Sequence, residues 1–373
     1  MRVLFVNRMA CLERGGGETF DLEISRHLVQ AGARVSFLSG APLCGPPPMP
    51  LEGAIVLHTP WLKKFPWDKV KGGWRIRKLE FDWFEWRAAR WVARHAGEFD
   101  VIQVCELPSL VYWLKKRGVK IPVVMRLTAP NYHDPRGGVP LAEALIASGM
   151  SIQRLQERGL SRVVDVPNAV DADVFRPQAS DFRKKHGIGA DEFVALYVAR
   201  FQAFKNHAML IEAFARFVRV QPAARLLLAG SGPLRERSEQ QAAALGIGGK
   251  VMFLGEVPFQ ELPGVYAAAD AKVISSDYES FCFAAIEAMS MALPVLTTDC
   301  AWVPRLVAEG AGIVVPVGDV AAFAAGLRRL AENPALRQRL GAAGRDLVLA
   351  RHTWPASAAK LLQLYQSLAP RPG

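Results

Sequence analysis

Two glutamates with a short apolar segment between them are the residues of this chain best suited to chemistry. Glu279 stands in a polar loop, and Glu287 follows eight residues later, inside a helical pattern over residues 281–291. The four residues that open this pattern are expected to carry backbone N–H groups without helical partners, which suits a phosphate. They are Ser280, Phe281, Cys282 and Phe283. Because carboxylates accept hydrogen bonds from sugar or ribose hydroxyls, the segment predicts a nucleotide-sugar site. An ordinary amphipathic helix with Glu287 facing water is the simpler alternative.

Two cations and a glycine-rich turn precede this segment. Arg200 and Lys205 lie in a loop between a predicted strand and a predicted helix, and Gly230 and Gly232 follow the next predicted strand. In a parallel sheet the carboxyl ends of the strands share one edge, where ligands bind. Cations and helix-start amides suit a diphosphate, and carboxylates suit hydroxyls. We therefore expect these residues to share one site with the two glutamates. Leu254, at the end of the predicted strand 251–254, is assigned to the same donor site.

Strand and helix patterns alternate along both halves of the chain, which predicts an α/β protein with parallel sheets. A length of 373 residues fits two domains. An irregular, proline-bounded segment over 161–177 separates the two series.

Two loops of the first half carry further candidates. Gly16 and Gly17 lie in a glycine loop between the predicted strand 2–7 and the predicted helix 18–30, where the backbone must approach another group. The loop matches neither GxGxxG nor a Walker motif, and a plain tight turn is the alternative. His133 and Asp134 follow a predicted strand at its carboxyl end, although a lone loop histidine is more often incidental.

The segment from Trp61 to His95 is rich in tryptophan and basic residues. It holds six of the nine tryptophans and ten Lys or Arg against four acids. Interleaved aromatic and basic residues suit an anionic membrane interface, with nucleic acid as a rival partner. The alternative is a core-packing helix over 76–95 with Leu79, Trp83 and Trp86 on its buried face. The residues assigned to an acceptor or membrane surface are Trp74, Arg75, Arg77 and Lys78.

Composition restricts the class of protein. Hydrophobic residues make up 51% of the chain and charged residues 22%, which predicts a folded globular protein. The net charge is +11, and residues 1–170 carry 24 Lys or Arg against 16 Asp or Glu. Five scattered cysteines without a CxxC favour a reducing compartment and argue against disulfides and a zinc site. No apolar run reaches membrane-spanning length, so we expect a cytoplasmic protein, either soluble or peripheral on the inner face of the membrane.

Several segments of the chain resemble motifs of the retaining family 4 glycosyltransferases of the GT-B fold, and they follow one another in the same order as in that family. The matching segments are GGGE at 15–18, VPNAVDADVFRP at 166–177, ARFQAFKN at 199–206, LLLAGSGPLR at 226–235 and the E-x7-E pair Glu279 and Glu287. Ser280 and Cys282 stand where the family has small glycines, and Cys300, Ala301 and Trp302 replace its glycine pair. The resemblance implies two Rossmann-like domains with parallel sheets facing across a cleft. It also implies an acceptor domain over 1–168, a nucleotide-sugar domain over 169–353, and a C-terminal helix over 354–373 that returns to the first domain.

The resemblance further implies roles for individual residues. Arg200 and Lys205 would neutralise the diphosphate leaving group, Glu287 would bind the ribose and Glu279 the donor sugar, with His133 as a further catalytic candidate. No metal or other cofactor is expected besides the nucleotide-sugar donor. The acceptor is expected to be a glycan or lipid-linked molecule in cell-surface polysaccharide or lipopolysaccharide synthesis, with no nucleic-acid partner. A nucleotide-sugar epimerase or hydrolase, or a non-catalytic sugar-nucleotide-binding protein on the same scaffold, stays open as an alternative.

Overall fold

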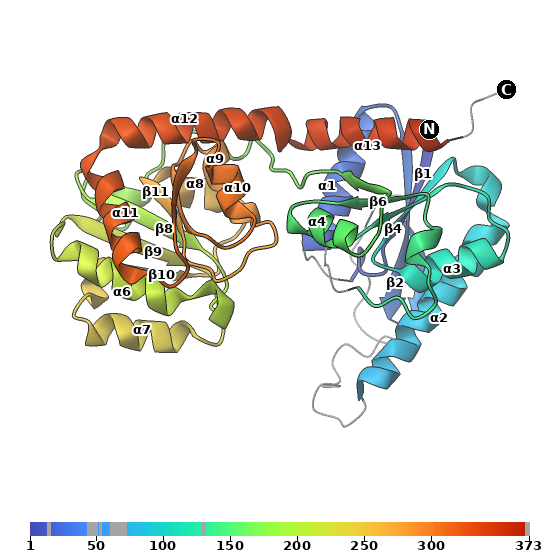
Figure 1. Cartoon of the computed structure of the whole chain (residues 1–373), viewed down its shortest axis with the longest axis horizontal. Helices are drawn as coiled ribbons and strands as arrows, with labels where there is room; N and C mark the ends of the chain where they lie inside the picture. The colour runs from blue at the N-terminus through green and yellow to red at the C-terminus, as the bar shows by residue number, and fades with distance from the viewer. Residues whose placement is uncertain (13–15, 43–50, 52–53, 60–72, 128–131, 370–373) are drawn as a thin grey trace. The chain divides into compact units, whose positions relative to one another are not determined.

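The chain folds around two separate parallel β-sheets, each covered by helices (Figure 1). The computed structural model describes residues 1–369 apart from 13–15, 43–50, 52–53, 60–72 and 128–131. Two compact units can be distinguished. Unit 1 consists of Met1–Asn168 and Trp354–Gly373, and unit 2 of Ala169–Thr353.

Unit 1 contains a seven-stranded parallel sheet in the order β3-β2-β1-β4-β5-β6-β7. Its strands are β1 (Arg2–Val6), β2 (Arg34–Pro42), β3 (Ala54–Thr59), β4 (Val101–Cys105), β5 (Val123–Arg126), β6 (Ala144–Ala147) and β7 (Val163–Asp165). The central strands are continuous apolar runs because both faces of the sheet are covered. The sequence analysis did not single out β3 or β6.

The helices of unit 1 cover this sheet. They are α1 (Gly16–Gln30), α2 (Gly73–Arg94), α3 (Pro108–Lys116), α4 (Met150–Glu157) and α13 (Trp354–Leu368). The C-terminal helix α13 packs against α1, where the rings of Phe20 and Trp354 meet edge to face at 5.8 Å (Figure 1). The hydroxyl of Tyr365 on α13 donates a hydrogen bond to Gln103 on β4. The last helix of the chain is therefore an integral part of unit 1.

Unit 2 contains a six-stranded parallel sheet in the order β10-β9-β8-β11-β12-β13. Its strands are β8 (Phe193–Val198), β9 (Ala224–Ala229), β10 (Val251–Gly255), β11 (Ala271–Ile274), β12 (Val295–Thr298) and β13 (Gly312–Val315). The strand order reverses between β8 and β11, which pair directly. In such doubly wound sheets, ligands bind outside the carboxyl ends of the strands at this reversal.

Eight helices are described in unit 2. They are α5 (Phe182–Lys185), α6 (His207–Val218), α7 (Arg235–Ala244), α8 (Leu262–Ala267), α9 (Phe283–Ser290), α10 (Val303–Val307), α11 (Val320–Glu332) and α12 (Pro334–Arg351). Three of them, α6, α11 and α12, begin at a side-chain cap. The side chain of Asn206 accepts a hydrogen bond from Met209 N and begins α6, and Asp319 does the same for α11. Helix α6 packs against α7 and α11, and α9 packs against α12.

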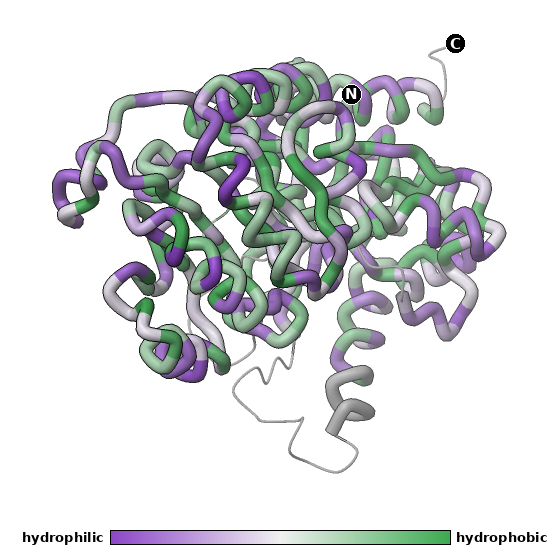
Figure 2. Tube along the Cα trace, turned by 60° about the vertical axis from the view of Figure 1, so that its left-hand side comes forward, coloured by the Kyte–Doolittle hydropathy of each residue, from purple (hydrophilic) through white to green (hydrophobic). Residues whose placement is uncertain are grey.

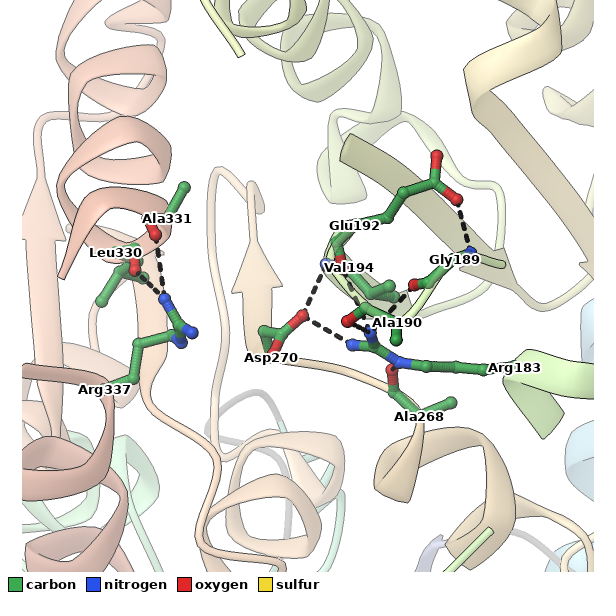
Figure 3. A network of polar contacts seen from close by, with 10 residues as sticks. All are labelled: Arg183, Gly189, Ala190, Glu192, Val194, Ala268, Asp270, Leu330, Ala331 and Arg337. Carbon is green, nitrogen blue, oxygen red and sulfur yellow. Dashed lines mark hydrogen bonds and ion pairs between the residues drawn. The ribbon is translucent and has the colours of Figure 1, made fainter. Parts of the chain in front are cut away.

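Arg183 on α5 fastens the start of unit 2 to the amino ends of the strands (Figure 3). Its guanidinium donates to the carboxylate of Asp270 at 2.7 Å and to the carbonyl of Ala268 at 2.8 Å. It also donates to the carbonyls of Gly189, Ala190 and Glu192. Asp270 in turn accepts a hydrogen bond from Val194 N. Arg183 and Asp270 therefore connect the amino end of β8 with the amino end of β11.

Hydrophobic and hydrophilic residues alternate along the helices in the tube of Figure 2, as expected for helices with one face on a core. Each unit has its own buried cluster of aliphatic and aromatic side chains. No helix in the described part of the chain combines the length and apolar composition needed to span a membrane.

Candidate functional site

The two glutamates of the E-x7-E pattern lie beyond the carboxyl end of β11 in unit 2. Glu279 belongs to the loop between β11 and α9, and Glu287 lies within α9. The loop after the neighbouring strand β8 carries Arg200 and Lys205. Because β8 and β11 pair at the reversal of strand order, the sheet places both loops at the position where ligands of such folds bind.

Lys205 and Glu279 form a partly buried ion pair across these two loops. The ammonium Nζ lies 2.5 Å from Oε1 of Glu279, and the two side chains are 17% and 7% exposed. Oε1 also accepts a hydrogen bond from Ser276 at 2.7 Å. Ser275 and Tyr197 hold the Lys205 backbone by donating to its carbonyl at 3.0 and 2.9 Å. The pair is thus fixed on both sides by hydroxyl groups.

Glu287 is held by a tyrosine from another helix. The hydroxyl of Tyr266 on α8 donates to Oε2 of Glu287 at 2.7 Å. Burial raises the pKa of Glu287, and the hydrogen bond from Tyr266 and the charge of Lys272 oppose that rise. This leaves Oε1 of Glu287 available to accept a further hydrogen bond.

The start of α9 differs in detail from the expectation. The helix begins at Phe283, two residues later than the pattern over 281–291 suggested, because Cys282 adopts a left-handed conformation with φ 75°. Within the described part of the chain, no acceptor bonds the backbone N–H groups of residues 280–283. These residues are Ser280, Phe281, Cys282 and Phe283. The predicted set of free donors is therefore present at the start of α9, beside Glu279.

Ala301 supports the loop that carries Glu279. It takes φ 79°, a conformation that glycine adopts without strain, and forms an isolated parallel bridge with Glu279. Glu279 N donates to the carbonyl of Cys300 at 2.8 Å, and Trp302 N donates to the carbonyl of Glu279 at 3.3 Å. Of Cys300, Ala301 and Trp302, only Ala301 takes a backbone conformation that favours glycine.

The glycine turn after β9 packs directly on the segment that carries Arg200. A Cβ on Gly230 would lie 2.1 Å from the carbonyl oxygen of Ala199, and one on Gly232 would lie 2.6 Å from that of Phe201. Both positions therefore require glycine. The Arg200 side chain is exposed at this edge. Leu254 is partly buried on β10. Strand β9 separates β10 from β8, the strand whose loop carries Lys205.

Gly16 and Gly17 form the first turn of α1 in unit 1, so the helix begins two residues earlier than expected. The carbonyl of Gly17 accepts a hydrogen bond at 2.7 Å from Arg126, whose guanidinium also pairs with Asp21 at 3.1 Å. Nearly all of this arginine is buried. The glycine turn is thus tied to the sheet of its own unit.

The two loop candidates after β5 have different surroundings. Asp134 accepts hydrogen bonds from the N–H groups of Gly138 and Val139, both at 2.8 Å, and so shapes its own loop. His133 is exposed in the same loop. Its catalytic role stays a prediction, since Thr128 and its neighbours up to residue 131 lie outside the described residues.

The alternative for the tryptophan-rich helix, a core face of Leu79, Trp83 and Trp86, is wrong. The buried positions of α2 include Phe84, Ala88 and Val92, whereas Leu79 is 66% and Trp86 is 36% exposed. The side chains assigned to an acceptor or membrane surface lie outside the described residues. They are Trp74, Arg75, Arg77 and Lys78, on the first turns of α2.

Sequence reasoning missed the residues that orient the two glutamates. Tyr266 and Ser276 bond Glu287 and Glu279, and Tyr197 bonds Ser276 at 2.9 Å. Lys272, a charged residue beside the apolar residues Val273 and Ile274, is a signal for this part of the site that the sequence does carry.

Comparison with known proteins identifies the family. Residues 178–347 match the family model described as glycosyl transferases group 1. A D-inositol 3-phosphate glycosyltransferase from Thermobispora bispora is 30% identical over 72% of this chain and 71% of its own. One from Geodermatophilus obscurus is 27% identical over 96% of this chain and 86% of its own.

Solved structures share the fold. Sucrose-phosphate synthase from Thermosynechococcus elongatus superposes with a TM-score of 0.78 at 23% identity, covering 98% of both chains. Anabaena HepE in complex with UDP superposes with a TM-score of 0.76 at 19% identity, covering 99% of this chain and 100% of its own. The two parallel-sheet, Rossmann-like units are those of GT-B glycosyltransferases, as expected. Together with the relatives, these findings show that the chain belongs to the group 1 glycosyl transferases.

Proposed function

We propose that this glycosyltransferase moves a sugar from a nucleoside-diphosphate sugar to an acceptor. The observation that carries the proposal is the Lys205–Glu279 pair beside the free N–H groups at the start of α9, in a family of glycosyl transferases. A lysine and helix-start amides suit the diphosphate, and a carboxylate suits the sugar hydroxyls.

The site suggests how the leaving group is stabilised. As the bond to the sugar breaks, negative charge accumulates on the departing diphosphate. Lys205 and the N–H groups of residues 280–283 are fixed donors at the carboxyl edge of the sheet, and such preorganised donors stabilise developing charge. Arg200, exposed at the same edge, adds a second cation. We propose that these groups replace a metal ion and that the transfer is retaining, as in family 4.

The two glutamates have separate parts in this proposal. Glu287, held through Oε2 by Tyr266, accepts a hydrogen bond from the ribose, and Glu279 accepts hydrogen bonds from the donor sugar. Glu279 must then share its contacts between Lys205 and the sugar. HepE, whose fold this chain shares, is described in complex with UDP, which makes UDP the first nucleotide to test.

Calorimetric titration with UDP, GDP, ADP and TDP tests the donor site. We expect one of them to bind wild-type protein and to bind the Lys205→Ala variant far more weakly, with the binding unaffected by EDTA. Hydrolysis or epimerisation of the matching nucleotide sugar without any acceptor would favour the alternative enzyme classes. Absence of binding by all four would overturn the proposal.

We further propose that the acceptor is a glycan or lipid at an anionic membrane on the cytoplasmic side. Unit 1 has a partly exposed tryptophan–arginine surface formed by Trp83, Trp86, Trp113, Arg87, Arg90 and Arg117. Arg90 lies 4.7 Å from the ring of Trp86, and Arg117 lies 5.5 Å from that of Trp113. Indoles beside cations suit the headgroup region of such membranes.

Co-sedimentation with phosphatidylglycerol-containing vesicles tests the membrane surface. We expect wild-type protein to sediment with these vesicles and not with pure phosphatidylcholine, and the Arg90→Ser/Arg117→Ser variant to remain in solution. Arg216→Ser/Arg328→Ser is the matched control, because both of these arginines are exposed on unit 2 and the change in charge is the same. Equal sedimentation of both double variants would contradict the proposal.

A further inference from the structure

Lys272 is a charged residue in the middle of a core strand. It lies on β11, paired with Leu196 on β8 and with Val295 on β12, and its side chain is completely buried. Its ammonium has no hydrogen-bond partner among the described residues. Strands covered on both faces are normally apolar, and a buried ammonium without a partner is costly. A charged group with this cost, and without a hydrogen-bond partner in the part of the chain that is described, points to a functional role.

The ammonium lies between two tyrosines that lead to the two glutamates. Nζ lies 5.3 Å from the ring centroid of Tyr197 and 5.9 Å from that of Tyr266, within the range of cation–π attraction. Tyr266 donates to Glu287, and the hydroxyl of Tyr197 lies 2.9 Å from that of Ser276, which donates to Glu279. Lys272 therefore lies between the tyrosine that contacts Glu287 and the tyrosine beside the serine that contacts Glu279.

Five charged or titratable groups act on Lys272 or are affected by its charge. The charges of Glu287 and Glu279 and a thiolate at Cys282 would raise its pKa, whereas the charge of Lys205 lowers it. Its own charge in turn lowers the pKa of His207. Burial is the largest influence and lowers the pKa of Lys272 to about 8.

We propose that Lys272 is a positioning residue of the donor site, a buried counter-charge that holds Tyr197 and Tyr266 and keeps Glu279 and Glu287 ionised and oriented when the nucleotide binds. The inference rests on the proposed function and assigns a role to a residue outside the motifs. Lys272 does not touch the substrate.

The need for such a counter-charge follows from the Lys205–Glu279 pair. A diphosphate that draws Lys205 away takes from Glu279 its nearest cation, at 2.5 Å. Lys272 cannot leave, because β11 is the central strand beside β8 and its side chain is enclosed. A lysine present only to fill space would be replaced without loss by methionine, which has a similar shape and no charge.

The Lys272→Met variant separates these two explanations. The charge is lost, so we expect the affinity for the best-bound member of the UDP, GDP, ADP and TDP panel to fall about tenfold or more. The urea midpoint is expected to rise, because an unpaired buried charge is replaced by an apolar group. A merely structural role would move affinity and stability in the same direction. The volume-conserving Ile274→Leu, on the same strand and equally buried, is the control for packing damage.

The pH profile gives a second readout. The charge of Lys272 is present below its pKa of about 8, so wild-type affinity is expected to fall as the pH rises through that value. Two of the facing groups are shifted well away from this range: burial raises the pKa of Cys282 to about 12 and lowers the pKa of His207 to about 4. Lys272→Met is therefore expected to show no such fall. Wild-type protein should also take up protons when it binds the nucleotide near pH 8, which calorimetry in two buffers of different ionisation enthalpy detects.

A double-variant cycle tests whether Lys272 acts through the glutamates. The losses in Lys272→Met and Glu287→Gln should not add in the double variant if one residue positions the other. Equal affinity and the same pH profile in wild type and Lys272→Met would overturn the inference while leaving the proposed function intact. Joint loss of affinity and stability in Lys272→Met would also overturn it. Absence of nucleotide binding in wild type would overturn both.

Discussion

Lys205 and Glu279 are joined by a 2.5 Å ion pair although 74 residues separate them in the chain. The pair spans the loops after β8 and β11, the two strands where the order of the sheet reverses. A cation and a carboxylate that both have proposed contacts with the donor are thus held together in the free protein. Their mutual attraction keeps both side chains ordered until the diphosphate competes for the lysine.

Replacing Lys205 by alanine is expected to weaken nucleotide binding about 30-fold. The change removes the charged donor to the diphosphate, which contributes about 2 kcal/mol. Among the described residues it leaves Ser276 as the one side-chain donor to the Glu279 carboxylate. Calorimetric titration measures the change. Lys185→Ala serves as the matched control, since that lysine is 68% exposed on α5. Equal affinities of Lys205→Ala and wild type would remove the assigned role.

Replacing Tyr266 by phenylalanine is expected to shift the pH dependence of nucleotide affinity. Burial raises the pKa of Glu287, and the hydrogen bond from Tyr266 opposes that rise. Without the hydroxyl the pKa rises further, so Glu287 becomes protonated, and stops accepting from the ribose, at a higher pH. Titrations between about pH 5 and about pH 8 should show affinity falling on acidification earlier in Tyr266→Phe than in wild type. Superposable curves would show that Glu287 does not titrate with binding.

The parallel sheets, and the proximity of the loops that carry Lys205 and Glu279, could be predicted from the sequence for a physical reason. Parallel strands joined by helices direct all carboxyl ends to one edge, so Lys205 and Glu279 had to approach each other once β8 and β11 were neighbours. The contact between Tyr266 and Glu287 is different. It depends on how α8 packs beside α9, which no local pattern of either segment specifies.

Helix α2 shows where periodicity misleads. Its large residues Leu79, Trp83 and Trp86 repeat with helical spacing, yet Leu79 and Trp86 are exposed. The helix buries Phe84, Ala88 and Val92 instead, a row at four-residue spacing on another face. The row that starts at Leu79 therefore indicated the wrong face, and the row that starts at Phe84 is the buried one.

Acidification is expected to destabilise the fold through His207. Its ring is buried against Phe201 at a centroid distance of 4.0 Å, and burial lowers its pKa from 6.5 to about 4. The unfolded chain therefore binds an additional proton between these values. The stabilisation is complete above about pH 6.5 and is lost as the pH falls toward 4, a change on the order of 3 kcal/mol. Urea unfolding across this range should show the loss in wild type and in the exposed-site control His186→Phe, and a smaller loss in His207→Phe.

Replacing Arg183 by methionine is expected to lower stability without affecting the site. The guanidinium binds Asp270 and four carbonyls at the amino ends of β8 and β11 (Figure 3). The loops of Lys205 and Glu279 follow the carboxyl ends of the same two strands. Loss of this partly exposed network should reduce the free energy of unfolding by about 2 kcal/mol. Nucleotide affinity should stay at the wild-type value, as in the neighbouring surface control Lys185→Met. A matching loss of affinity would show that the amino ends of the strands are coupled to the site.

Glycine at position 282 is expected to stabilise the start of α9 more than alanine does. Cys282 holds φ 75°, which costs a residue with a Cβ about 1 kcal/mol and costs glycine nothing. Because Cys282→Ala and Cys282→Gly both remove the thiol, the difference between their urea midpoints isolates the backbone term. Glycine should be the more stable of the two, the reverse of the usual order near a helix. Nucleotide affinity should persist in Cys282→Gly, because glycine adopts the conformation that leaves the N–H groups of residues 280–283 free. A more stable alanine variant would mean that the left-handed conformation is not maintained in solution.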